Sequence, residues 1–80
     1  MQAIGRIIVV QEQRFHLVTD NGQGLLLTVS YHAPIELSDL IWLQRAHARV
    51  LVEYTGESNL TSGVAHRISL LSPEVLTPTT

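Results

Sequence analysis

The residues of this chain that could support chemistry are few and lie far apart along the sequence. Successive histidines, at His16, His32, His47 and His66, are about fifteen or more positions apart, and there is no cysteine. A zinc site is usually built from cysteines, or from histidines about three to five residues apart. The sequence therefore predicts no metal site, and the alternative is a site assembled from separate strands, such as those of His16 and His66.

The serines, carboxylates and glycines form no catalytic arrangement either. No serine lies in a Gly-x-Ser-x-Gly turn, which would present a nucleophile. Glu53 and Glu57 flank a stretch that predicts a solvated loop, not the buried setting that raises a carboxyl pKa for acid catalysis. Gly22 and Gly24 precede an extended segment, so they form no phosphate cradle at a helix start. We expect no enzyme, no catalytic residue and no cofactor.

Length and composition restrict the class of protein further. The chain has 80 residues, of which 45% are hydrophobic and 15% charged, and its formal net charge is -2. This composition predicts one folded domain and excludes a disordered chain. A net negative charge argues against a general nucleic-acid binder, whose surface is normally strongly positive.

The sequence predicts neither a membrane protein nor a secreted one. Apolar runs such as residues 7–10 are far shorter than the roughly 20 residues that cross a bilayer. No basic stretch followed by an apolar one opens the chain, so no secretory signal is predicted. Small extracellular domains usually depend on disulfides, and a chain without cysteine is instead expected in the cytoplasm.

Strands are predicted throughout the first half, where apolar residues alternate or are β-branched. They cover residues 4–10, 14–19 and 25–31. Gly5 lies inside the first strand, which indicates a bulge or a close approach of two backbones. Asn21-Gly22, between two apolar runs, predicts a hairpin turn, since both residues tolerate a positive φ. The three strands would form a meander.

A short helix and two more strands follow. Apolar residues at helical spacing predict a helix over residues 38–46, with Ser38 as its N-cap. Strands are predicted over residues 49–54 and 64–71, on either side of a polar loop at 55–63. Residues 1–72 would form a single domain, and residues 73–80, which include two prolines, are predicted to be a flexible tail.

This order of three strands, a helix and two strands resembles the OB-fold, a five-stranded Greek-key barrel. The resemblance is one of topology and spacing over residues 3–71, without a signature motif. It implies a mainly β, five-stranded OB-like barrel whose first strand bends at Gly5 to pair in both sheets. An SH3-like barrel is the alternative, but its helix is usually a single turn before the last strand. The longer helix after the third strand favours the OB-like fold.

The resemblance also implies where a ligand would bind. In OB-folds, oligonucleotides and sugars cross the face of the second and third strands. Arg14, His16 and Arg67 are the candidate contacts for a ligand or a nucleic acid. Single-strand binding uses aromatic platforms and a positive groove, and the mapped face has no Phe, Tyr or Trp. Weak binding of single-stranded nucleic acid or of a small ligand is therefore the alternative function.

Aliphatic side chains exceed what the inside of a small barrel can hold. If Phe15 and its counterparts fill the barrel, Val18, Leu26 and Leu51 are left on outer faces, unless the assumed strand register is shifted by one position. Trp42 stands off the apolar stripe of the predicted helix, and tryptophan is enriched at interfaces. We therefore expect Trp42, Val18, Leu26 and Leu51 to contact a protein partner or a second copy of the chain. The predicted function is a non-catalytic interaction module.

Overall fold

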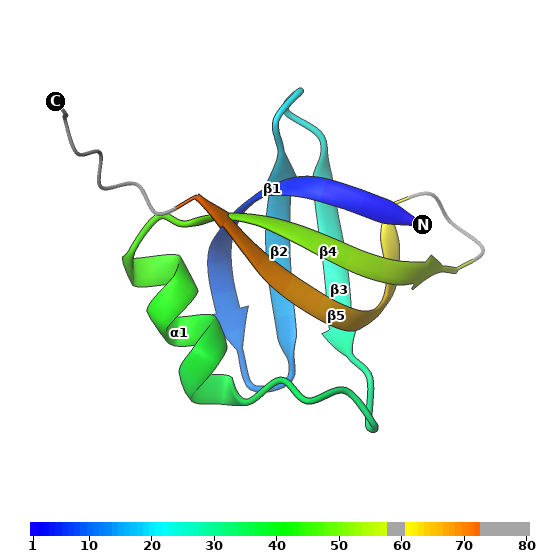
Figure 1. Ribbon diagram of the computed structural model, residues 1–80. Coiled ribbons are helices and arrows are strands. Elements are labelled where there is room, and N and C mark those ends of the chain that lie inside the picture. Colours follow the sequence, from blue (N-terminus) through cyan, green and yellow to red (C-terminus); the bar gives the residue numbers. More distant parts are fainter. Residues whose placement is uncertain (58–60, 73–80) are drawn as a thin grey trace, which may run out of the picture.

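The computed structural model describes residues 1–57 and 61–72 of the chain. These residues form five strands and one helix (Figure 1). In chain order the elements are β1 (Gln2–Gln11), β2 (Arg14–Thr19), β3 (Gly24–Val29), α1 (Leu37–Arg45), β4 (Arg49–Gly56) and β5 (Ser62–Ser72). The predicted order of elements is confirmed. The tail predicted at 73–80 and the middle of the predicted loop, 58–60, lie outside the described residues.

The strands close into a barrel in the order β1-β2-β3-β5-β4. β3 and β5 pair in parallel, and the other neighbouring strands are antiparallel. In Figure 1, β4 and β5 cross in front of β2 and β3, and β1 pairs with both β2 and β4. The fold is therefore mainly β and OB-like, with α1 packed beside β1.

Gly5 allows β1 to take part in both walls of the barrel. It pairs with Thr19 of β2 and with Val50 of β4. A Cβ atom at this position would lie 2.0 Å from the carbonyl oxygen of Val18. The close backbone approach predicted at Gly5 is thus confirmed, and the bulge lies further along β1, where the register shifts between Ile7 and Val9.

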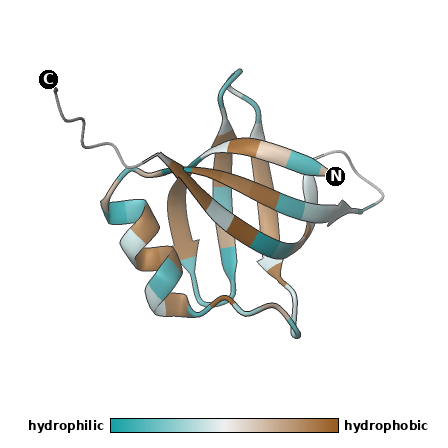
Figure 2. Ribbon diagram, in the orientation of Figure 1, coloured by the Kyte–Doolittle hydropathy of each residue, from teal (hydrophilic) through white to brown (hydrophobic). Residues whose placement is uncertain are grey.

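Alternate side chains of the strands fill the barrel, and the inward faces predicted for β2, β3 and β4 are confirmed at their centres. The core comprises Ile7, Phe15, Leu17, Leu25, Leu27, Leu40, Leu43, Ala48, Val50, Val52 and Ala65. Figure 2 shows apolar residues along much of the strands, interrupted by polar residues within the strands and in the turns. The third strand ends at Val29, short of the predicted residue 31, and Tyr31 is 91% exposed.

The β2–β3 turn differs from the prediction by one position. The Gly22 N–H donates to the carbonyl oxygen of Thr19 at 2.8 Å, so Asp20 and Asn21 form the centre of the turn. Of these residues only Gly22 has a positive φ, of 91°. This is the pattern of a type I turn followed by a left-handed glycine. The Thr19 side chain supports it by bonding the Asn21 side chain and by accepting the Gln23 N–H at 3.0 Å.

A carboxylate in the first turn caps the N-terminus of α1. The helix begins at Leu37 with Glu36 as its N-cap, so the prediction of Ser38 as N-cap is wrong. Asp39 Oδ2 accepts a hydrogen bond from the Glu36 N–H at 3.1 Å. A carboxylate three residues into the helix can satisfy the N-cap donor in this way, which moves the start of the helix ahead of the serine.

The last turn of α1 ends in a Schellman motif. The His47 N–H donates to the Gln44 carbonyl and the Ala48 N–H to the Leu43 carbonyl, both at 3.1 Å. His47 has a φ of 52°, the left-handed position that glycine usually occupies in this motif. The motif turns the chain directly into β4, and Ala48 is buried in the core.

Candidate functional site

The outer faces of β1, β2 and β3 carry an apolar patch around one histidine. Val18 and Leu26 line a shallow hollow of about 270 Å³ with Ile8 and His16. The strand register explains this, because His16 pairs with Leu26 on one side and with Val9 on the other. We call Ile8, His16, Val18 and Leu26 the β2–β3 patch. The structure thus brings together Val18 and Leu26, two of the four predicted interface residues.

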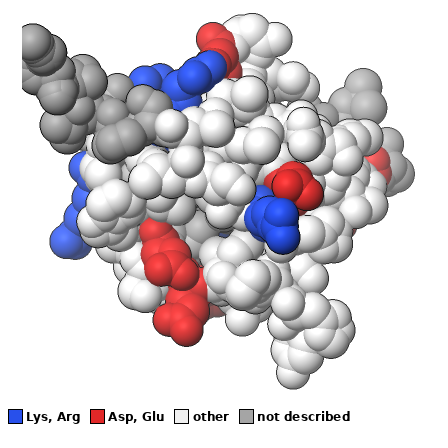
Figure 3. All heavy atoms as spheres, in the orientation of Figure 1, with Lys and Arg blue, Asp and Glu red and all other residues white. Residues whose placement is uncertain are grey.

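The three predicted ligand contacts do not form one surface. Arg14 and His16 both lie exposed on β2, two positions apart and therefore on one face. Arg67 lies on β5, where its Nη1 is 4.0 Å from Oε2 of Glu53 on β4. Figure 3 shows a pair of opposite charges side by side on this wall. Because β3 separates β2 from β5 in the barrel, Arg67 is not part of the face that Arg14 and His16 share.

A second apolar surface lies between the helix and the end of the barrel. We call it the α1–β5 groove. Its volume is about 240 Å³ and its lining residues are Pro34, Ile35, Asp39, Trp42, Leu43, Ile68 and Leu70. Trp42 is 55% exposed and Leu70 is 49% exposed. Trp42 therefore stands at the rim of an apolar recess, not on an isolated stretch of helix.

Leu51 lies apart from both surfaces. It is half-buried on β4 and pairs with Ile4 of β1. Arg6, which pairs with Val18 on β2, lies on β1 between Ile4 and the β2–β3 patch. The residues predicted as one interface thus occupy three places: Val18 with Leu26, Leu51, and Trp42.

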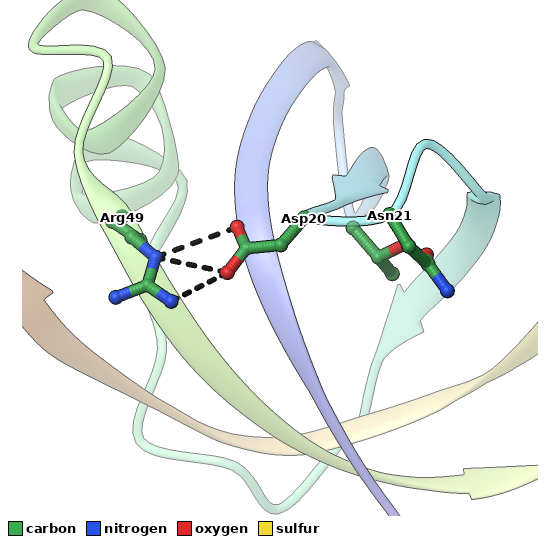
Figure 4. A network of polar contacts seen from close by, with 4 residues as sticks. Asp20, Asn21 and Arg49 are labelled. Atoms are coloured by element: carbon green, nitrogen blue, oxygen red, sulfur yellow. Dashed lines mark hydrogen bonds and ion pairs between the residues drawn. The ribbon is translucent and has the colours of Figure 1, made fainter.

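An ion pair fastens the β2–β3 turn to β4 (Figure 4). Arg49 donates from Nε to Oδ2 of Asp20 at 3.1 Å, and its Nη2 bonds the same oxygen. The hydrogen bond from Arg49, with the charges of Arg49 and Arg6, holds the pKa of Asp20 below its usual range. The hydrogen bond to Asp20 likewise raises the pKa of Arg49. This ion pair has a structural role, because it anchors the turn and pairs the charge of each residue with that of the other.

The four histidines are spread over the surface. His16 lies in the β2–β3 patch, His47 ends α1, and the His32 ring meets a neighbouring tyrosine edge-on, with ring centres 5.5 Å apart. His66 Nε2 lies 2.8 Å from Thr55 Oγ1 across β4 and β5. In the part of the chain that the structure describes, no three His, Asp or Glu side chains gather as a metal site would require.

Sequence reasoning missed the residues that face Trp42 across the α1–β5 groove. Ile68 and Leu70 are two positions apart on β5, so they share one side of the strand, and this alternation is visible in the sequence. Pro34 and Ile35 join them from the segment that leads into α1. No local pattern indicates that juxtaposition, because it depends on how the helix packs against the barrel.

The described strands form a closed, OB-like barrel. Within residues 1–57 and 61–72, no helix has the length and apolar character needed to cross a membrane. No protein-family model matches the sequence, and no curated protein matches it.

Proposed function

We propose that the protein is a non-catalytic interaction module that binds protein surfaces, a second copy of itself included, through apolar side chains outside its barrel. The exposure of large hydrophobic residues carries this proposal. Ile8 and Leu26 are 48% and 39% exposed in the β2–β3 patch, and Trp42 and Leu70 are 55% and 49% exposed at the α1–β5 groove. Exposed apolar residues that cluster, as these do, mark interaction sites more often than single ones.

The remaining features of the chain support an interaction role in the cytoplasm. The histidines are dispersed, and the best-formed charge pair, Asp20 with Arg49, is used to hold a turn. The cysteine-free sequence requires no oxidising compartment for folding. We therefore propose that the protein acts in the cytoplasm.

Sedimentation equilibrium of the purified chain tests the proposal. Over a range of micromolar concentrations, at low and at high salt, the mean mass should rise above the 8.9 kDa of one chain. The association should persist at high salt, because burial of apolar surface is not screened by ions as charge pairs are. A mass of one chain at every concentration would contradict self-association.

Weak binding of single-stranded nucleic acid or of a small ligand is the second candidate, favoured by one observation. Arg14 and His16 share the exposed face of β2. Among the described residues, however, the outward positions of β2 and β3 carry no Phe, Tyr or Trp ring on which bases could stack. Titration of a labelled oligonucleotide at low salt tests this candidate. Binding that Arg14→Ala weakens would support it, and no detectable binding would end it.

A further inference from the structure

We infer that two copies of this chain form a twofold-symmetric dimer in which their α1 helices lie antiparallel and Trp42 of each copy enters the α1–β5 groove of the other. The inference rests on the proposed function and names the partner and the surface for one of its two apolar sites.

Trp42 and the groove beside it provide both halves of such a contact. Leu40 and Leu43 turn the buried face of α1 toward the barrel, which leaves Trp42 on the outer side, 55% exposed. Beside it, Ile68 and Leu70 form an apolar wall of the recess. A twofold interface uses the same surface on both copies, so that surface must carry a projection and a matching recess. A large aromatic side chain at the centre of an interface is also the type that contributes most to binding.

The charges along α1 also fit an antiparallel pair. The first turn of the helix carries Asp39, and the last turn carries Arg45. Figure 3 shows acidic side chains beside one end of α1 and basic ones at the other. When two such helices cross antiparallel at Trp42, the acidic turn of each copy faces the basic turn of the other. A parallel pair would oppose like charges, so the charge pattern selects the antiparallel arrangement.

The helical repeat identifies the positions that meet across the twofold axis. Ser38 and Arg45 lie about one turn before and one turn after Trp42, on the same outer side of the helix. In the antiparallel dimer, position 38 of one copy therefore lies opposite position 45 of the other. Substitutions at positions 38 and 45 can therefore test the antiparallel arrangement of the helices as well as the existence of the dimer.

Two substitutions on α1 should weaken the dimer, as measured by sedimentation equilibrium. Trp42→Ala removes the side chain that fills the groove, and we expect the dissociation constant to rise about thirtyfold or more. Arg45→Glu places a carboxylate opposite the acidic turn of the partner, and we expect a rise of at least about tenfold. Both side chains are exposed, so circular dichroism should show an unchanged fold.

Matched controls separate the interface from general effects on the surface. Tyr31→Ala removes an aromatic ring that is 91% exposed outside the groove. Arg14→Glu makes the same change of charge as Arg45→Glu, but on β2. Both controls should dimerise as the unmodified chain does. The double variant Ser38→Arg, Arg45→Glu restores opposite charges between the two copies, and it should recover most of the association that Arg45→Glu alone loses.

Each outcome decides the inference. Loss of association in both α1 variants, with intact controls and recovery in the double variant, supports it. Equal association of the unmodified chain and of the Trp42→Ala and Arg45→Glu variants overturns it. The proposed function then stands, and the β2–β3 patch becomes the surface to substitute. An unmodified chain that is monomeric at every concentration overturns both the dimer and self-association.

Discussion

Gly5 is the residue at which the two walls of the barrel meet. It pairs with β2 and with β4, and a Cβ atom there would lie 2.0 Å from the Val18 carbonyl oxygen. That oxygen belongs to the backbone, so it cannot rotate away. We expect Gly5→Ala to lower the free energy of unfolding by about 3 kcal/mol or more, the upper part of the range for overpacked positions. Urea unfolding followed by circular dichroism measures the change.

Gly24 is the matched control for Gly5, since no heavy atom lies within 4 Å of the position of its Cβ. Gly24→Ala should leave the free energy of unfolding unchanged or raise it by up to about 1 kcal/mol, because alanine restricts the unfolded chain. Equal destabilisation by the two substitutions would show that the close approach at Gly5 is not the cause.

Asp20 should make stability depend on pH. Its pKa in the folded chain lies below the value of about 3.9 for an unfolded chain, chiefly through the hydrogen bond from Arg49. The ionised carboxylate therefore stabilises the fold above that pH, and this contribution is lost as the pH falls through the folded-state pKa. Asp20→Asn should be less stable than the unmodified chain at neutral pH. Urea titrations should show the difference shrinking in acid, and a difference that stays constant with pH would contradict this account.

At the scale of the elements, the end of α1 contains a strained residue. His47 holds a left-handed φ of 52° and closes the Schellman motif that leads into β4. This conformation costs a residue with a side chain roughly 1–2 kcal/mol, and glycine adopts it freely. We expect His47→Gly to raise the free energy of unfolding by about 0.5–1 kcal/mol, partly offset by the greater freedom of glycine in the unfolded chain. The backbone carbonyl of residue 47, which accepts a hydrogen bond from Arg6, is retained in this variant.

Thermal unfolding measures this effect, and His32→Gly is the control. His32 lies in an exposed loop and does not have a positive φ. Glycine there should therefore bring no stabilisation. If His47→Gly were as destabilising as His32→Gly, the left-handed backbone would not be a source of strain.

The strands could be predicted from the sequence better than the ends of the elements. In a small barrel each strand has one side in the core and one in water, so alternation identifies the strand directly. The ends depend on which side chain satisfies a backbone group. Asp39 bonds the Glu36 N–H and starts α1 earlier than Ser38 would. The Thr19 hydroxyl bonds within the β2–β3 turn, which is centred one position before the predicted one.

At the scale of the whole molecule, the candidate sites could be predicted only in part. Val18 and Leu26 meet because β2 and β3 are adjacent in sequence and antiparallel, which the hairpin pattern indicates. Arg67 could not be placed, because its distance from β2 depends on how β5 closes the barrel between β3 and β4. The recess beside Trp42 likewise depends on the packing of α1, which no local spacing encodes.

The two apolar surfaces share no residue. In the dimer that we propose, α1 and the groove would be covered, and the β2–β3 patch of each copy would remain open. The assembled molecule would then offer two equivalent patches, each with His16 beside aliphatic side chains, to a further protein partner. Substitution of Leu26 should leave the dimer intact, in contrast to substitution of Trp42.

A pair of amide NMR spectra of the unmodified chain, recorded at low and at high concentration, would show directly whether the chain associates through the α1–β5 groove. Association through the α1–β5 groove predicts concentration-dependent shifts concentrated in α1, Ile35, Ile68 and Leu70, with the Trp42 indole N–H among the largest. Residues of the Asp20 turn should not shift. Spectra that are identical at the two concentrations would contradict the claim that this barrel associates with itself through its exposed apolar residues.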